Sequence, residues 1–227
     1  GDGRSAVPGV GPSAYWEAIL HEALALGPRL VVNTGDLVHG PANPEEWTRF
    51  RATLPPGAPF IAVRGNHDRG ADLEGMGLSP GGLFAWRLGS VLLVGLDTEG
   101  PDGPVFERIG RLSALLAEPA PFKIVVMHRP VWSRGTHGSD ERGLNARLVP
   151  IFDAHRVALV ISGHDHDYER FCPSLGVGAA RHCAASGTTY IVTGGAGTFT
   201  NPAPGLSRRV PAALAAADAA ASRHFSA

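Results

Sequence analysis

The stretch Ala158-Leu159-Val160-Ile161-Ser162-Gly163-His164-Asp165-His166 holds the pattern from which the fold can be predicted. Residues 158–161 form a short apolar run, which predicts a buried strand. Two histidines at alternate positions follow directly, and such side chains can point to the same side and share a metal site. By itself, this pair does not separate a metal site from an ordinary polar loop.

The same arrangement recurs elsewhere in the chain. Apolar runs predict further buried strands, and most of these are followed by a polar cluster. These runs lie at residues 30–32, 60–63, 122–127 and 189–192. Asp36 follows the run at 30–32, Asn66 follows the run at 60–63, and His128 follows the run at 122–127.

Helical periodicity and capping signals separate these strands. Helices are predicted at residues 13–26, 43–54, 105–116 and 144–155, with a strand pair at 84–88 and 91–96. Alternating strands and helices predict an α/β layered domain, and ligands in such sheets bind at the carboxyl ends of the strands. The alanine-rich residues 212–221 are expected to form a helix or a low-complexity loop, and residues 222–226 to begin a strand.

The composition is that of an ordinary globular domain and excludes several classes of protein. The 227 residues are 44% hydrophobic and 18% charged, enough for one sizeable core. The net charge is −1, and the largest basic cluster is Arg208-Arg209, so no footprint for nucleic acid or anionic lipid is visible. No apolar stretch in these 227 residues is long enough to span a membrane, and none has the pattern expected of a signal peptide.

The two cysteines, Cys172 and Cys183, bracket a loop of small residues. A disulfide between them is sterically reasonable and would imply an oxidising compartment. Two unrelated reduced thiols are the alternative.

The polar clusters together form an ordered series, roughly thirty to sixty residues apart: Gly1-Asp2, Gly35-Asp36, Gly65-Asn66-His67-Asp68, His128 and Gly163-His164-Asp165-His166. This series resembles the calcineurin-like metallophosphoesterase superfamily. The run from Gly163 to Arg170 and the later Gly194-Gly195-Ala196-Gly197 look most like the purple acid phosphatase branch. The resemblance implies the metallophosphoesterase fold, a layered α/β/β/α sandwich flanked by helices, whose first strand would be missing from this chain.

The resemblance also implies a binuclear metal centre. The first ion would be held by Asp2, Asp36 and His166, and the second by Asp36, Asn66, His128 and His164. Carboxylate, amide and imidazole donors without cysteine suit Fe, Mn or Zn. Two such ions can neutralise a phosphoryl group and supply a bridging hydroxide that attacks it.

Catalytic and substrate-binding residues follow from the same resemblance. His67 and Asp68 would form the catalytic set, with His67 contacting the phosphate and protonating the leaving group. A metal-ligand or structural role is the alternative for His67. Asn66 and His67 would bind substrate, as would His137, for which a solvated loop position is equally expected. His21 and His155 are expected at the surface or at helix ends.

The pattern departs from the family at the first metal. The superfamily has Asp-x-His as its first motif, but this chain has Asp2-Gly3-Arg4. Purple acid phosphatases instead use a tyrosine three residues after the bridging aspartate, where this chain has His39. His39 is therefore predicted to complete the first metal site, and the alternative is that it orients His67.

Taken together, the sequence predicts a single metallophosphoesterase domain over residues 1–227, as a piece of a longer, secreted or periplasmic chain. The expected substrate is a small phosphomonoester, with a phosphodiester or a nucleotide as alternatives. A binder that has lost turnover is the rival class. Nucleic-acid polymer and membrane are not expected partners, and the oligomeric state stays open.

Overall fold

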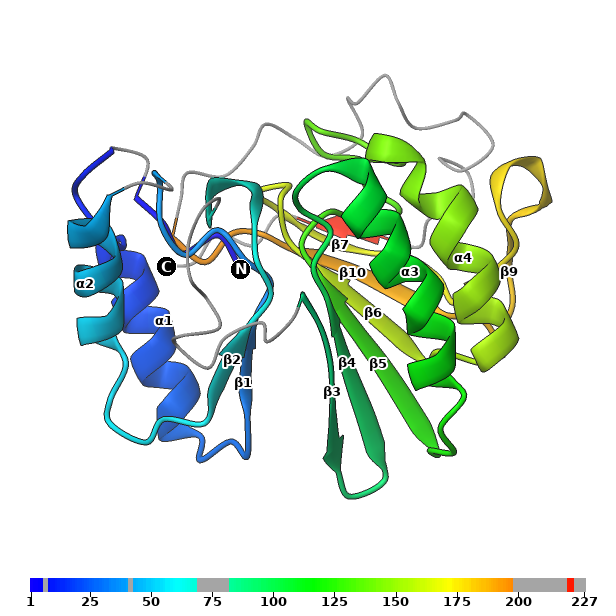
Figure 1. Cartoon of the computed structure of the whole chain (residues 1–227), viewed down its shortest axis with the longest axis horizontal. Helices are drawn as coiled ribbons and strands as arrows, with labels where there is room; N and C mark the ends of the chain where they lie inside the picture. The colour runs from blue at the N-terminus through cyan, green and yellow to red at the C-terminus, as the bar shows by residue number, and fades with distance from the viewer. Residues whose placement is uncertain (6–7, 41–42, 69–81, 198–219, 223–227) are drawn as a thin grey trace.

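The computed structural model describes residues 1–5, 8–40, 43–68, 82–197 and 220–222 (Figure 1). The α-helices are α1 Ala14–Ala25, α2 Pro44–Thr53, α3 Asp102–Leu116 and α4 Leu144–His155. The strands are β1 Val31–Asn33, β2 Phe60–Ala62, β3 Leu83–Leu88, β4 Val91–Leu96, β5 Phe122–Met127, β6 Leu159–Ser162, β7 Tyr168–Arg170, β8 Ser174–Leu175, β9 His182–Cys183, β10 Thr189–Thr193 and β11 Ala220–Ser222.

The first two helices begin at side chains that cap them. Ser13 Oγ accepts a hydrogen bond of 3.1 Å from the Trp16 amide at the start of α1. Asn43 Oδ1 accepts from the Glu45 and Glu46 amides at the start of α2, and Pro44 occupies the first helical position. These contacts satisfy amide groups that have no partner within the helix, so both helices begin where the sequence favours a start.

The strands form a seven-stranded sheet, a separate parallel pair and a small hairpin. The large sheet has the order β11-β7-β10-β6-β5-β4-β3, and its central strands β4, β5, β6 and β10 run parallel. The outer strands β3, β7 and β11 pair antiparallel. Among the residues that the structure describes, strands β1 and β2 pair only with each other, and β8 pairs with β9.

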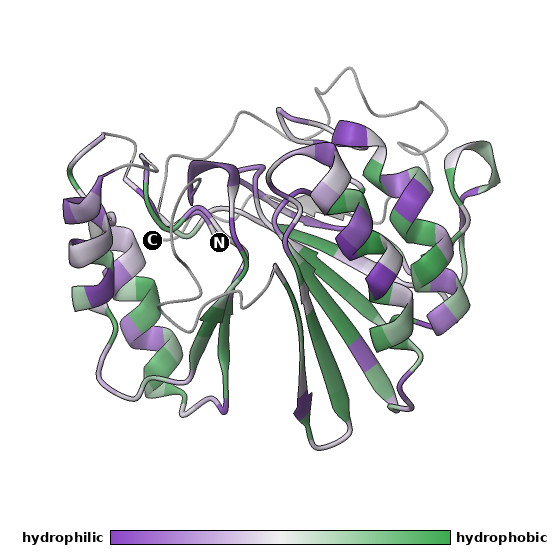
Figure 2. Ribbon diagram, in the orientation of Figure 1, coloured by the Kyte–Doolittle hydropathy of each residue, from purple (hydrophilic) through white to green (hydrophobic). Residues whose placement is uncertain are grey.

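The hydrophobic core is divided among three clusters, which define the layers. One packs α1 and α2 onto β1 and β2, and includes Trp16 and Phe50. A second packs α3 and α4 onto the large sheet, around Leu112 and Phe152. A third lies between the two sheets and joins Ile61 to neighbours on β3, β4 and β5. Figures 1 and 2 show the same order of helices, apolar strands and helices, so the predicted α/β/β/α layering is confirmed.

The main differences from the predicted elements lie after residue 166. Strand β7 was not predicted because its sequence, Tyr168-Glu169-Arg170, carries no apolar pattern; it forms by pairing with β10. Strand β11 pairs with the other edge of β7. The rest of the predicted segments at 212–221 and 222–226 lies outside the described residues.

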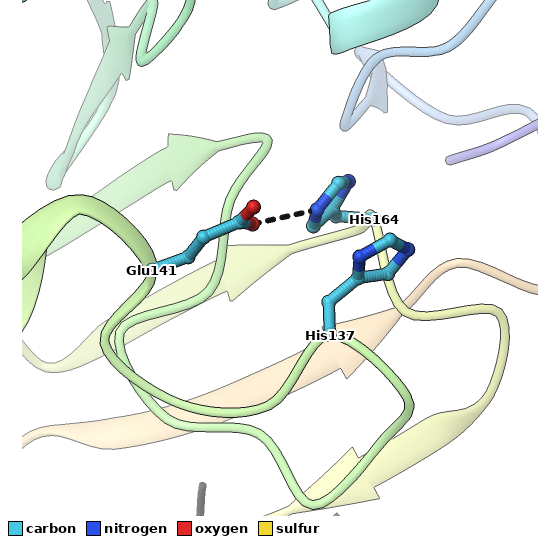
Figure 3. Close-up of side chains that lie close together, drawn as sticks. All are labelled: His137, Glu141 and His164. Atoms are coloured by element: carbon cyan, nitrogen blue, oxygen red, sulfur yellow. Dashed lines mark hydrogen bonds and ion pairs between the residues drawn. The ribbon is translucent and has the colours of Figure 1, made fainter.

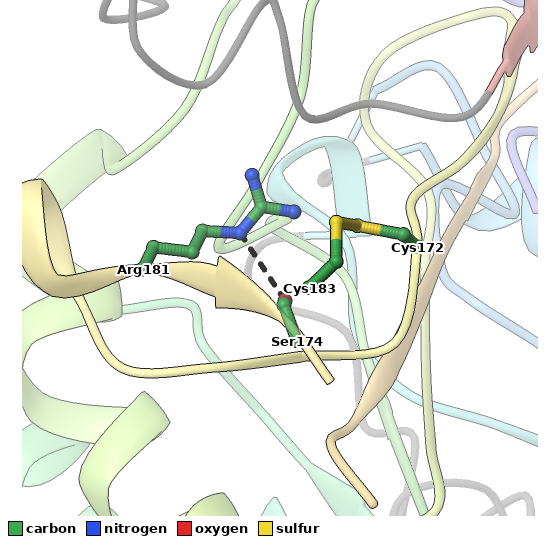
Figure 4. Close-up of a disulfide and its surroundings, with 4 residues drawn as sticks. All are labelled: Cys172, Ser174, Arg181 and Cys183. Atoms are coloured by element: carbon green, nitrogen blue, oxygen red, sulfur yellow. Dashed lines mark hydrogen bonds between the residues drawn. A yellow bond between two sulfur atoms is a disulfide. The ribbon is translucent and has the colours of Figure 1, made fainter. Parts of the chain in front are cut away.

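A disulfide joins Cys172 and Cys183 across the β8–β9 hairpin (Figure 4). The guanidinium of Arg181 stands 4.7 Å from the ring centroid of Trp132, and its Nε donates to Ser174 Oγ at 3.2 Å. The disulfide, rather than two separate thiols, is therefore the arrangement in this structure. Within the described ranges, no helix combines the length and the apolarity needed to cross a membrane.

Candidate metal centre

The polar clusters meet where the strands of both sheets end. Asp36 follows β1 through a short turn, and Asn66 follows β2. His128 directly follows β5 of the large sheet, and His164 lies just beyond β6. Asp2 joins them from the start of the chain, because its amide donates to the Gly35 carbonyl at 2.8 Å. Rigid strands thus bring residues distant in sequence to one place.

Three of the converging residues have strained backbones. Asp2, Asp36 and His164 have φ values of 61°, 56° and 72°, which side-chain-bearing residues seldom adopt. Such strain concentrates at functional sites, where the surrounding structure enforces it.

Glycines allow the close approach of these loops. A Cβ on Gly65 would lie 2.1 Å from Asp36 Oδ1, and one on Gly163 would lie 2.5 Å from Asp2 Oδ2. Any larger residue would push the carboxylates away. Steric crowding therefore explains why glycine precedes Asn66 and His164 in the sequence.

A first group of buried acceptors consists of Asp2, Asp36 and His166. Their ligand atoms all lie within 4.8 Å of one another. Asp2 is fully buried, its Oδ1 has no hydrogen-bond partner among the described residues, and His166 Nε2 lies 3.6 Å from that oxygen. Burial and then the charge of Asp36 raise the pKa of Asp2 well above its usual range. A cation between the two carboxylates would relieve this repulsion, so the group fits a metal ion.

A second group adjoins the first through Asp36. His128 Nδ1 donates to the Thr34 carbonyl at 2.8 Å, which leaves Nε2 as the nitrogen with the lone pair. Nε2 faces two further acceptors, Asn66 Oδ1 at 3.0 Å and Asp36 Oδ1 at 3.5 Å. The lone pair of Nε2, Asn66 Oδ1 and the carboxylate of Asp36 thus face one another, which also fits a metal ion. A backbone carbonyl on the other ring nitrogen is usual for a metal-bound histidine.

His164 borders this second group, with its ring 4.9 Å from that of His128. His164 Nε2 lies 2.8 Å from Glu141 Oε2 and is engaged by the wall of the site, which leaves Nδ1 as the nitrogen that could face a metal (Figure 3). Burial lowers the pKa of His164 to about 3, so the ring is neutral, as metal ligation requires. The His137 ring stacks on that of His164 at 3.9 Å.

The wall beside His164 also contains Glu141, Arg129 and Glu99, which the sequence did not indicate. Glu141 forms a group with His137 and His164 that could hold a cation by composition, but the guanidinium of Arg129 already occupies this place. Arg129 forms an ion pair with Glu141, and Nη1 lies 3.2 Å from His164 Nε2. Glu99 holds Arg129 in turn through contacts of 2.7 and 3.1 Å. The position of Arg129 directly after His128 was the only sequence signal for this network.

His67 lies at the shared carboxylate, but in a different way from the predicted ligands. Its amide donates to Asp36 Oδ1 at 2.9 Å, and its ring Nδ1 donates to the His39 carbonyl at 2.8 Å. The carbonyl fixes the proton on Nδ1 and leaves Nε2 as the exchangeable nitrogen. This arrangement fits a proton donor, and that role stays a prediction.

The predicted catalytic role of Asp68 does not agree with the structure. Asp68 is fully buried, and both carboxylate oxygens are occupied by backbone amides. Oδ2 accepts from Asp36 and Gly65, and Oδ1 accepts from Leu37 and Val38, at 2.8 to 3.2 Å. Asp68 therefore ties the loop after β1 to the loop after β2, and does not face a substrate.

The predicted role of His39 as the fourth ligand of the first metal also needs correction. His39 does not join Asp2, Asp36 and His166 in the group that could hold an ion. Its Nδ1 lies 3.0 Å from Nη1 of Arg4, and its ring lies 5.2 Å from that of His67. Because a guanidinium can only donate, this nitrogen is the acceptor and is not free for a metal. The alternative, that the His39 side chain orients His67, stays a prediction, because the hydrogen bond of the His67 ring is to the backbone carbonyl of residue 39.

Comparison with known proteins identifies the family to which the chain belongs. A family model described as calcineurin-like phosphoesterase matches residues 9–168. Tartrate-resistant acid phosphatase type 5 of Sus scrofa is 31% identical over 97 residues, which are 43% of this chain and 25% of that protein. A protein of Arabidopsis thaliana named probable inactive purple acid phosphatase 1 is 25% identical in an alignment 209 positions long, which covers 74% of this chain and 34% of that protein. The matched segments thus span only a quarter to a third of these relatives.

Solved structures show the same fold at low sequence identity. The purple acid phosphatase PPD1 of yellow lupin superposes with a TM-score of 0.69 at 19% identity, over 85% of this chain and 41% of that one. A dimetal phosphatase of Danio rerio superposes with a TM-score of 0.57 at 15% identity, over 82% of this chain and 80% of that one.

Proposed function

Because the chain belongs to the calcineurin-like phosphoesterase family, we propose that it is a two-metal hydrolase of small phosphomonoesters. One observation carries the proposal: the buried carboxylates of Asp2 and Asp36 converge with the ring of His166, and Asp2 Oδ1 has no hydrogen-bond partner among the described residues. Asp2, Asp36 and His166 would hold the first ion, and Asp36, Asn66, His128 and His164 the second. Two bound divalent ions would supply positive charge to phosphoryl oxygens and lower the pKa of water.

The protein's own groups supply orientation and a proton. His67 holds its ring against the His39 carbonyl and would donate the Nε2 proton to the leaving-group oxygen. His137 is exposed and stacks on His164, so its ring can contact a substrate that approaches the centre. Asn66, at the end of β2, would both hold a metal and contact the phosphoryl group.

A divalent pair, from among Fe, Mn and Zn, suits the ligands better than a trivalent ion. The donors of the first site are two carboxylates and one imidazole, with no phenolate or thiolate. The disulfide between Cys172 and Cys183 supports residence in an oxidising compartment, as in a secreted or periplasmic protein.

The rival function is a metal or phosphate binder without turnover. The similarity to a protein named as a probable inactive phosphatase favours it. Against it, the chain retains the residues that a degenerate copy would be expected to lose: the bridging Asp36, Asn66, His164 and His166. The rival would bind metal and phosphate but hydrolyse nothing.

The deciding experiment is hydrolysis of p-nitrophenyl phosphate and of bis(p-nitrophenyl) phosphate by the chain loaded with Mn²⁺, Zn²⁺ or Fe²⁺. We expect metal-dependent turnover, faster on the monoester, that chelation abolishes. The matched control is Asp36→Asn, which should lose metal and turnover together. Metal binding without turnover of either ester would favour the rival, and faster turnover of the bis-ester would make the chain a diesterase.

A further inference from the structure

Arg4 is a buried cation beside the first group of acceptors. The residue is 7% exposed, and its amide donates to the Asp36 carbonyl at 3.2 Å. Its Nε lies 3.5 Å from Asp36 Oδ2, and this nitrogen has no hydrogen-bond partner among the described residues. Nη1 contacts His39 Nδ1 at 3.0 Å and the Ser5 carbonyl at 3.4 Å. The guanidinium is therefore held against the carboxylate that the two proposed metal sites share.

The contacts of Asp36 differ between its two oxygens. Oδ1 receives the His67 amide at 2.9 Å and lies 3.5 Å from His128 Nε2, on the side of the second group. Oδ2 faces the guanidinium of Arg4. The positive charge of Arg4 thus acts on the half of the carboxylate that points away from His128.

The same guanidinium also engages His39, the residue that the sequence predicted as a further ligand of the first site. Arg4 donates to His39 Nδ1, so this nitrogen cannot bind a metal while the contact lasts. The first site then has three protein donors, Asp2, Asp36 and His166, and the second has four. An arginine does not lose its charge at any ordinary pH, so the effect is permanent.

We propose that Arg4 makes the two metal sites unequal, so that the second site binds its ion tightly and the first binds its ion weakly and exchangeably. The inference rests on the proposed two-metal function. A fixed positive charge within a few ångströms repels an incoming dication, and burial leaves little water to screen it.

The test is calorimetric titration of the full chain with MnCl₂ after removal of its metals by chelation. For the wild type we expect two binding steps whose dissociation constants differ by about tenfold or more. After gel filtration, metal analysis should find about one ion per chain. Neither measurement depends on catalytic turnover.

Variants at residue 4 identify the cause. Arg4→Met removes the charge and should tighten the weak step by about tenfold or more, whereas Arg4→Lys keeps the charge and should keep the weak step. Arg4→Gln provides a second neutral variant that retains a donor for His39, should the methionine disturb folding. Arg87→Met is the matched control, because Arg87 is an exposed strand residue paired with Glu118, and it should titrate like the wild type.

Each outcome decides a different point. Two equally tight steps in the wild type would overturn the inference and leave the proposed function standing. A neutral variant that folds, as judged by circular dichroism, yet keeps the wild-type weak step would do the same. Failure of the wild type to bind any Mn²⁺ or Zn²⁺ would overturn the proposed function together with the inference.

Discussion

Backbone carbonyls fix the protons of two histidine rings in the centre. His128 donates through Nδ1 to the Thr34 carbonyl, and His67 donates through Nδ1 to the His39 carbonyl. The two rings nevertheless differ in the surroundings of Nε2. Nε2 of His128 faces Asn66 and Asp36 in the second group, whereas no such acceptors are found at Nε2 of His67 within the described chain. One ring is therefore suited to a metal and the other to a proton.

This difference predicts separate effects on metal content and on rate. His67→Ala should keep the metal content of the wild type but lower kcat by about a hundredfold to ten-thousandfold, the usual contribution of a general acid. Asp36→Asn should lose metal. Metal analysis alongside steady-state kinetics on p-nitrophenyl phosphate separates the two. A metal-free His67→Ala protein would mean that His67 is itself a ligand.

A stability measurement tests the structural role of Asp68. Asp68→Ala leaves four buried backbone amides without an acceptor, and we expect the free energy of unfolding to fall by about 3 kcal/mol or more. Urea denaturation measures the change, and Asp102→Ala, at an exposed position, is the control. Unchanged stability with a reduced kcat would return Asp68 to the catalytic set.

The sequence could predict which residues converge, but not how each side chain is used. A glycine directly precedes Asp36, Asn66 and His164, because the loops pack closely there. Such a pair of neighbouring residues can be recognised in the sequence. The contact between Arg4 and His39 joins residues 35 positions apart, and nothing local to either residue indicates it. The same is true of the four amides around Asp68, which come from two different loops.

At the scale of elements, apolar strands were predictable and polar ones were not. Strands β4 and β5 have the predicted bounds because buried parallel strands carry continuous apolar runs. Strand β7 has Glu169 at its centre, 1% exposed. Its Oε1 accepts from Ser133 Oγ at 2.7 Å, and both its oxygens contact the Arg134 amide. Glu169 thus fastens the loop after residue 132 to the sheet.

This fastening should depend on pH. Burial raises the pKa of Glu169 to about 7 from an ordinary 4.5, so the folded chain holds this proton more tightly than the unfolded chain. The stabilisation is full below pH 4.5 and is lost as pH rises through about 7, a change of about 3 kcal/mol. Urea denaturation from pH 4.5 to 8 should show the loss in wild type relative to Glu169→Gln. Parallel curves for the two proteins would contradict the raised pKa.

At the scale of the whole molecule, the candidate centre joins the two sheets. Asp36 and Asn66 come from the ends of β1 and β2, whereas His128, His164 and His166 come from the large sheet. Between the sheets lies the smallest of the three hydrophobic clusters. Apolar packing joins the two sheets less extensively than it joins the helices to the sheets. Bound ions would therefore add links between the two sheets. Without ions, burial and the neighbouring charge of Asp36 raise the pKa of Asp2 at the same junction.

Removal of metal should accordingly lower the melting temperature. Ions that bind only the folded chain, at a free concentration about a thousand times their Kd, contribute about 4 kcal/mol. For a chain of this size each kcal/mol shifts Tm by about 2 to 4 °C, so EDTA should lower Tm by about 8 to 16 °C. Added Mn²⁺ should restore it, and Asp36→Asn should melt at a temperature that EDTA does not change. If a chain shown by metal analysis to be metal-free melts like the loaded one, the ions do not link the two sheets, and packing between β2 and the large sheet suffices to hold them together.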